Sequence, residues 1–119
     1  MRTAWFFIAL GASLVLAVAH VYASSVDLYW TYRWLDIPMH ILGGFALGSL
    51  IIAFLMRHKP GMFWLLMLGV AIGWEVFEVL IGMPRPTDYP LDTLKDLIDD
   101  GVGALIAYGL ARLTLWRSV

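Results

Sequence analysis

The sequence predicts an all-α fold, a single domain over residues 1–119 in which four helices cross a membrane and both termini face the cytoplasm. Composition is the first reason, because 61% of the 119 residues are hydrophobic and 14% are charged, with a mean hydropathy of +0.81. Soluble domains have a much more polar balance. Length is the second reason. One crossing of the hydrocarbon core takes roughly 20 helical residues, so the chain has room for about four.

Four apolar stretches define the predicted helices: residues 4–23, 38–56, 62–83 and 97–116. The first also has features of a cleaved signal peptide, since Arg2 precedes it and Ala17-Val18-Ala19 offers a small-x-small cleavage site. Its length favours a retained helix. The uncharged part of the fourth, residues 101–111, would be only about 16 Å long. That span therefore has to extend outward to Leu97.

The basic residues divide unequally between the two sides of this arrangement. One side holds five: Arg2, Arg57, Lys59, Arg112 and Arg117. The other holds three: Arg33, Arg85 and Lys95. Cytoplasmic loops carry the excess of Lys and Arg, which places both termini in the cytoplasm. All nine acidic residues fall in the half of the predicted bundle that faces away from the cytoplasm. The net charge of −1 gives no basic excess for nucleic-acid binding, and the absence of cysteine excludes disulfides and thiolate ligands.

Helical spacing predicts which polar side chains share a face, because residues three or four apart on a helix project together. Three sets have this spacing: Asp36 with His40, Gly44 and Gly48; Glu75 with Glu78; and Asp92 with Asp96 and Asp99. The GxxxG pairs Gly44/Gly48 and Gly69/Gly73 permit close approach of helix backbones. Three helices are therefore expected to bring their polar faces together near the outer leaflet.

The carboxylates of this zone outnumber its cations, which predicts a bound divalent metal ion. Carboxylate oxygens with one imidazole suit Mg, Mn or Ca, and Zn less readily. The expected metal ligands are His40, Glu75, Glu78, Asp96 and Asp99, and the expected supporting acids are Asp36, Asp92 and Asp100. Because Asp100 points about 100° away from Asp99 on a helix, only one of the two is expected to face a given partner. Protonated acids and a proton or ion pathway are the alternatives.

The same residues resemble a known family. Asp36-x3-His40 with Gly43-Gly44, then Trp74-Glu75-x2-Glu78, then Asp92-Thr93-x2-Asp96 is similar to the pattern of the VanZ-like small bacterial membrane proteins and their uncharacterised relatives. The likeness runs from Leu35 to Ala111. It implies a multi-pass protein of the bacterial inner membrane with a role in the cell envelope. The family usually has Asn one turn after its last Asp, where this chain has Asp99 or Asp100, and its characteristic Arg is matched only loosely by Arg85.

Three functions are compatible with such a site. As an enzyme, the protein would be a metal-dependent hydrolase or transferase acting on lipid-linked phosphate, with His40 or Glu75 as general base. The residues expected to hold the phosphate are Arg33, Arg85 and Lys95. As a non-catalytic protein, it would use the metal to staple its helices while binding lipid or an envelope partner. Ion or proton transport is weaker and requires an oligomer, since residues 46–56 and 103–111 carry no charge.

Overall fold

The computed structural model describes residues 1–55, 57–82 and 89–118, and every regular element within these ranges is a helix. The elements are α1 (Arg2–Ser25), α2 (Leu28–Thr31), the 3₁₀ helix η1 (Arg33–Leu35), α3 (Asp36–Phe54), α4 (Pro60–Leu80) and α5 (Tyr89–Leu113). The all-α prediction is confirmed for this part of the chain.

Three of the helices are long and apolar enough to cross a membrane: Arg2–Ser25, Arg33–Phe54 and Pro60–Leu80. They cover the first three predicted stretches with shifts of a few residues at their ends. Many of their large apolar side chains face outward, for example Phe7, Leu14 and Val18 on α1, each about 62% exposed. A helix surface of that kind is typical of a helix that faces lipid. These features indicate a membrane protein.

The fourth predicted span differs most from its helix. We expected residues 97–116, whereas α5 runs from Tyr89 to Leu113. The N-terminal half of α5 carries five charged residues: Asp92, Lys95, Asp96, Asp99 and Asp100. It is therefore helical but polar, and α5 is not among the helices whose composition marks them as spans. An acid in the first turn, Asp92, complements the helix dipole and favours this early start.

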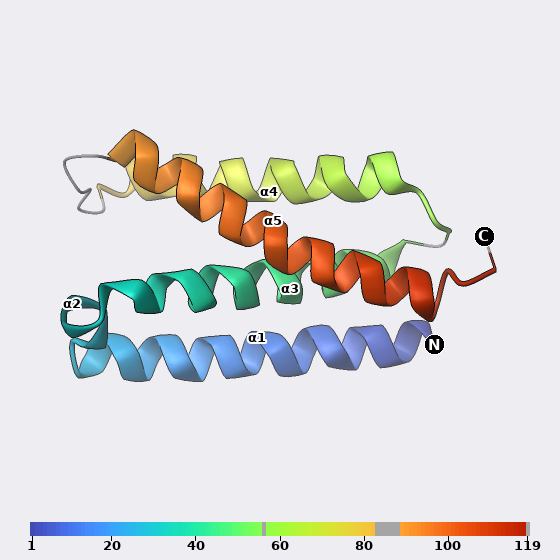
Figure 1. The fold of residues 1–119 in the computed structure, drawn as a ribbon, viewed down its shortest axis with the longest axis horizontal. Coiled ribbons are helices and arrows are strands. Elements are labelled where there is room, and N and C mark those ends of the chain that lie inside the picture. The colour runs from blue at the N-terminus through green and yellow to red at the C-terminus, as the bar shows by residue number, and fades with distance from the viewer. Residues whose placement is uncertain (56, 83–88, 119) are drawn as a thin grey trace.

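Helix α3 lies at the centre of the bundle (Figure 1), with α1 antiparallel along one side and α5 crossing it obliquely on the other. Helix α4 packs less extensively, against both α3 and α5. The N-terminus, the connection from α3 to α4 and the end of α5 lie at one end of the molecule. The opposite end holds α2, η1 and the beginning of α5. The bundle therefore has two chemically different ends.

The crossing of α3 and α5 is a backbone contact. A Cβ atom at Gly44 would overlap the Asp100 carbonyl, and one at Gly103 would overlap the Ile41 carbonyl. A Cβ at Gly48 would lie 3.2 Å from that of Ala107. Small residues permit such an approach, and inside a bilayer close packing is what drives helix association. The predicted approach at Gly44 and Gly48 is confirmed.

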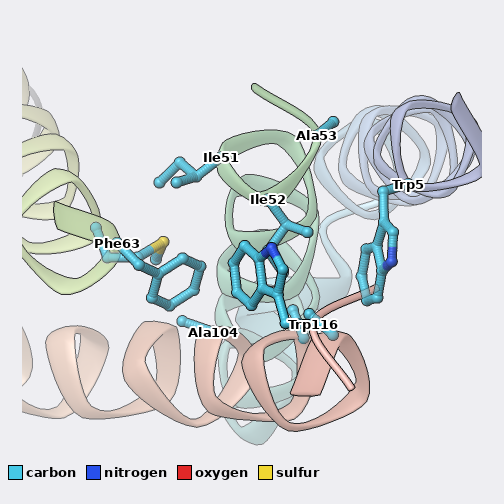
Figure 2. Packing of buried hydrophobic residues seen from close by; sticks show 10 residues of the cluster. Trp5, Ile51, Ile52, Ala53, Phe63, Ala104 and Trp116 are labelled. Carbon is cyan, nitrogen blue, oxygen red and sulfur yellow. The ribbon is translucent and has the colours of Figure 1, made fainter. Parts of the chain in front are cut away.

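The main cluster of buried apolar residues lies near the end that holds both termini (Figure 2). Trp5, Ile52, Phe63 and Ala104 come from the four long helices, and Trp116 follows α5. Each of these side chains is at most 4% exposed. Arg2 closes the same end, because its Nε and Nη2 donate to the Ala53 carbonyl at 3.2 and 3.1 Å. This packing fixes the crossing and leaves the other end to polar side chains.

Candidate metal centre

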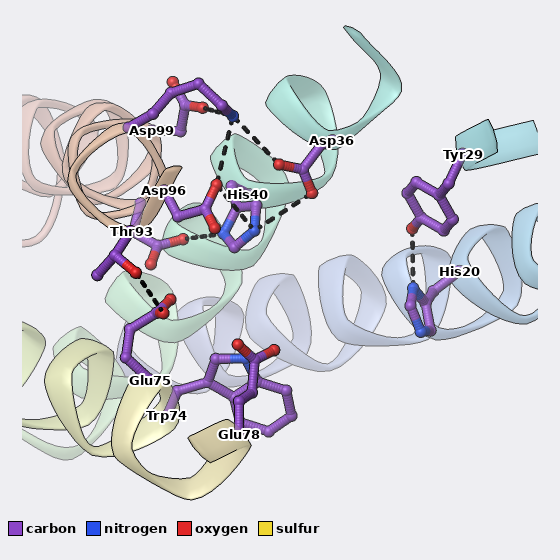
Figure 3. Close-up of polar contacts among 12 residues, drawn as sticks. His20, Tyr29, Asp36, His40, Trp74, Glu75, Glu78, Thr93, Asp96 and Asp99 are labelled. Atoms are coloured by element: carbon purple, nitrogen blue, oxygen red, sulfur yellow. Dashed lines mark hydrogen bonds and ion pairs between the residues drawn. The ribbon is translucent and has the colours of Figure 1, made fainter. Parts of the chain in front are cut away.

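The beginnings of α3 and α5 lie side by side at the polar end, and both present acids to the space between them (Figure 3). We define the acid–histidine cluster as Asp36 and His40 from α3 with Lys95, Asp96, Asp99 and Asp100 from α5. Asp36 and His40 are one helical turn apart and face the same way. Because Gly44 lets the two backbones touch next to the cluster, these short side chains reach across to the other helix.

His40 has both ring nitrogens directed at carboxylates. Its Nδ1 lies 3.0 Å from Asp100 Oδ1, and its Nε2 lies 3.5 Å from both Asp36 Oδ1 and Asp96 Oδ1. An ionised carboxylate only accepts hydrogen bonds, so Asp100 holds the ring proton on Nδ1. In the neutral imidazole, the lone pair of Nε2 then points between Asp36 and Asp96.

Lys95 lies on the exposed side of the cluster. Its Nζ donates to Asp36 Oδ2 at 3.1 Å, to Asp96 Oδ1 at 3.3 Å and to Asp99 Oδ2 at 3.3 Å. The cluster contains four carboxylates and at most two positive charges, those of Lys95 and a protonated His40. Two negative charges remain even when the imidazole is charged. With all four carboxylates ionised, a divalent cation would balance that charge.

Within the described ranges, Asp36, His40 and Asp96 form a group that could hold a metal ion. One ligand atom from each lies within 4.8 Å of the others. Ligands of a common ion bind at about 2.0 to 2.6 Å from it, so neighbouring ligand atoms at this separation need only a small adjustment. Asp96 is 7% exposed, and Asp36 and His40 are half-buried. The ammonium of Lys95 contacts the same two carboxylates, so it competes with an ion at this position.

Two predicted ligands on α4 have other neighbours. Thr93 Oγ1 donates to Glu75 Oε2 at 3.3 Å, and Trp74 Nε1 donates to Glu78 Oε1 at 2.9 Å. Glu75 is buried, 8% exposed. The structure does not place either glutamate in the group that Asp36, His40 and Asp96 form. Helix α4 lies against the first turns of α5, which brings Glu75 to Thr93 and not to His40.

The remaining predicted residues lie around the cluster. Asp99 contacts Lys95 and Asp100 contacts His40, so the two adjacent acids face different partners, as their angular separation requires. Asp92, half-buried, is one turn before Asp96 on α5. Arg33 is exposed and stacks over the Trp30 ring at 5.7 Å. Arg85 lies outside the described residues.

Three features of this end were not predicted. Asp36, expected to support the ligands, is itself placed among them, and Lys95, expected to hold phosphate, forms ion pairs with three acids. The spacing of Asp36 and His40 was the available signal for the first. Tyr29 shares a hydrogen bond of 2.8 Å with His20. Burial, and then the charge of Asp36, raise the pKa of the Tyr29 phenol, so this group stays protonated at neutral pH.

A shallow apolar hollow lies on α4. It has a volume of about 400 Å³ and is lined by Val70, Gly73, Trp74 and Phe77. A Cβ at Gly73 would meet nothing within 4 Å, so the missing side chain contributes to the hollow. Trp74 connects it to the polar end through the hydrogen bond to Glu78. A hydrocarbon chain fits the chemistry of this surface.

Comparison with known proteins gives no relative from which a function could be transferred. No protein-family model, no curated protein and no solved structure matches the chain. The resemblance to the VanZ-like proteins therefore rests on the spacing of acids, histidine and glycines alone. The chemistry of the acid–histidine cluster is the basis for the functional argument.

Proposed function

We propose that the protein is a multi-pass protein of the bacterial inner membrane that binds a divalent cation and uses it in chemistry on lipid-linked phosphate. The orientation of His40 is the observation that carries this proposal. Histidines that bind metals commonly donate their second ring N–H to a carboxylate, which fixes the tautomer and the ring orientation. Asp100 makes that contact here, while Nε2 faces Asp36 and Asp96.

The proposed topology has four crossings, with α5 as the fourth and both termini in the cytoplasm. Helix α5 has 25 residues, about 37 Å at the α-helical rise, which is long enough to cross and to extend into the headgroup zone. Isolated acids near the hydrocarbon boundary are costly. Asp99 and Asp100 are paired with Lys95 and His40, which reduces that cost. The cluster would then lie at the depth of the outer lipid headgroups.

The ligands favour Mg, Mn or Ca over Zn, because two of the three are carboxylates. Three protein ligands leave coordination positions for water and for a substrate phosphate. Bound metal would polarise the phosphoryl group and lower the pKa of a bound water. Since His40 has both nitrogens engaged, the buried carboxylate of Glu75 is the better candidate for general base.

The proposed substrate is a lipid because both parts of such a molecule have a counterpart near the polar end. The phosphate would reach the metal and the exposed Arg33, and the chain would lie along the apolar hollow on α4. A non-catalytic role is the second candidate. It is favoured by the close contact of α3 and α5 at Gly44 and Gly103, which an ion shared by both helices would lock. Transport would require an oligomer, since α3 and α5 pack tightly at Gly48 and Ala107.

Metal titration of the purified protein tests the proposal. We expect Mn²⁺ or Mg²⁺ to raise the melting temperature, corresponding to about 2.7 kcal/mol of added stability at roughly 100 times Kd. Asp96→Asn should abolish the shift. Asp27→Asn is the matched control, because this substitution makes the same chemical change at an exposed acid outside the cluster, at the N-terminus of α2.

Phosphate release from polyprenyl phosphates and phospholipids then separates the two roles. Metal-dependent release that is lost in Asp96→Asn and Glu75→Gln supports an enzyme. Stoichiometric metal without release on any of these substrates supports the structural role. A protein whose melting is indifferent to Mn, Mg, Ca and Zn has no such metal centre, and the proposal fails.

A further inference from the structure

The end of the bundle opposite the acid–histidine cluster is strongly basic. We define the basic end by its cationic residues: Arg2 at the start of α1, Arg57 and Lys59 between α3 and α4, and Arg112 and Arg117 at the end of α5. The fold brings these separate segments to the same end of the molecule (Figure 1). The acid nearest to Arg112 along α5 is Asp100, about 18 Å away by helical rise. The charges of the basic end are therefore not neutralised by the acids of the cluster.

The cations of the basic end have two different roles. Arg2 donates to the Ala53 carbonyl, and Arg112 Nη1 donates to the Trp116 carbonyl at 3.1 Å, so these two stabilise the ends of α3 and α5. Arg57, Lys59 and Arg117 have exposed side chains. Arg57 and Lys59 lie between α3 and α4, and Arg117 lies after α5, next to the Trp116 ring that contacts His58. All three are therefore available to a partner.

An anchored histidine fixes the segment that carries two of the exposed cations. His58 Nε2 lies 2.7 Å from the Tyr108 hydroxyl, and its ring lies against that of Trp116, tilted by 46° with centroids 5.1 Å apart. Burial and the neighbouring Arg112 lower the pKa of His58, so it adds no charge at neutral pH. Its neighbours Arg57 and Lys59 are held at the surface on either side of it.

Exposed apolar side chains adjoin the same cations. Phe54 is 67% exposed three residues before Arg57, Met62 is 44% exposed three residues after Lys59, and Leu113 is 73% exposed. A phospholipid presents this combination, with a phosphate next to hydrocarbon chains. An acidic soluble protein would neutralise the cations but would leave the apolar side chains in water.

We propose that the basic end is a binding surface for anionic phospholipid headgroups, with Arg57, Lys59 and Arg117 contacting the phosphate. A basic residue near an anionic membrane surface contributes about 1 kcal/mol to binding, which corresponds to a factor of about five. Three such residues on one surface produce a clear preference for anionic over zwitterionic lipid. This inference is independent of the proposed metal centre at the other end.

Spin-labelled lipids measure that preference in the intact protein. The full chain is reconstituted in phosphatidylcholine, and the motionally restricted fraction of labelled phosphatidylglycerol is compared with that of labelled phosphatidylcholine. We expect phosphatidylglycerol to be preferred, and the preference to fall by up to about fivefold for each of Arg57→Gln, Lys59→Gln and Arg117→Gln. The matched controls Arg57→Lys, Lys59→Arg and Arg117→Lys keep the charge and should keep the preference.

Three results would overturn the inference. The first is equal association of the two labelled lipids with the unsubstituted protein. The second is a preference that survives in the triple Gln variant. The third is displacement of labelled phosphatidylglycerol by soluble glycerol phosphate or by an acidic peptide at equal charge concentration, which would mean that the surface binds free anions or acidic protein.

Discussion

Lys95 forms ion pairs with three acids of the cluster, and it occupies the position that a second cation would need. Its Nζ contacts Asp36 and Asp96, which also supply two of the three candidate ligand atoms. Its side chain is 40% exposed, so water is close enough to accept the ammonium if it moves away. Lys95 and a metal ion are therefore alternative partners of the same carboxylates.

Replacing Lys95 by methionine removes the ammonium and leaves the carboxylates to the metal ion alone. In metal-free protein we expect Lys95→Met to lower the melting temperature, because the acids lose their shared cation. Affinity for Mn²⁺ should rise by roughly fivefold to tenfold, since a screened ion-pair network of this kind contributes about 1 kcal/mol or slightly more. Isothermal titration with Mn²⁺ measures the change, and Lys59→Met at the basic end is the control. A fall in affinity would show that Lys95 assists metal binding and does not compete with it.

At this scale the sequence predicted which residues are polar neighbours on one helix, but not how neighbours on different helices meet. The pairing of Asp36 with His40 follows from their spacing of four. The contacts of His40 with Asp100, and of Thr93 with Glu75, depend on how α5 crosses its neighbours. A crossing geometry is set by packing over the whole interface, which the local spacing of residues does not contain.

The contact between α3 and α5 depends on two glycines that face backbone atoms of the other helix. Gly44 lies against the Asp100 carbonyl and Gly103 against the Ile41 carbonyl. Gly69 and Gly73 on α4 have the same spacing as a GxxxG pair, yet a Cβ at either would meet nothing within 4 Å. Gly44 and Gly103 are therefore packed against another helix, whereas Gly69 and Gly73 are open, and the effects of substitution at the two pairs can be compared.

Alanine substitutions test this difference. Gly44→Ala or Gly103→Ala should destabilise the protein by about 1–3 kcal/mol or more, because the backbone has to move to accommodate a methyl group. Gly69→Ala and Gly73→Ala should be neutral or slightly stabilising, since alanine is the better helix former. Unfolding in mixed detergent micelles provides the measurement. Equal effects at all four positions would contradict the packing described for α3 and α5.

The helix boundaries show what hydropathy can and cannot predict. The α1, α3 and α4 segments were predicted to within a few residues, because each is a long apolar run bounded by polar or turn residues. For α5 the predicted membrane span begins at Leu97, whereas the helix itself begins at Tyr89. Its first turns are rich in acids, which a hydropathy criterion excludes although they are helical. The feature that the criterion excluded is also the part of α5 that builds the acid–histidine cluster.

Over the whole molecule, charge is separated along the long axis. The acid–histidine cluster occupies one end of the bundle and the basic end the other, with the apolar core nearer the basic end. Lys and Arg are retained on the cytoplasmic side during membrane insertion. The separation therefore predicts a single orientation, with the cluster outside.

Cysteine labelling tests this orientation, and the chain has no cysteine of its own to interfere. Ser24, in the last turn of α1, and Lys59, before α4, are both exposed and lie at opposite ends of the molecule. In intact cells an impermeant maleimide should label Ser24→Cys and leave Lys59→Cys unmodified until the membrane is opened. The reverse pattern would invert the topology and place the cluster in the cytoplasm.

The hydrogen bonds from Arg2 to the Ala53 carbonyl bear on the order in which the helices pack during synthesis. They join residues 51 positions apart, so the hairpin of α1 and α3 can close while the ribosome is still synthesising the second half of the chain. In the proposed four-span topology, Asp36 would enter the bilayer with His40 as its neighbour on α3, and Asp99 would enter later with Lys95 as its neighbour on α5. Each half would then carry its own counterion. Because four of the six cluster residues lie on α5, a nascent chain that ends before Lys95 contains only Asp36 and His40 of the cluster.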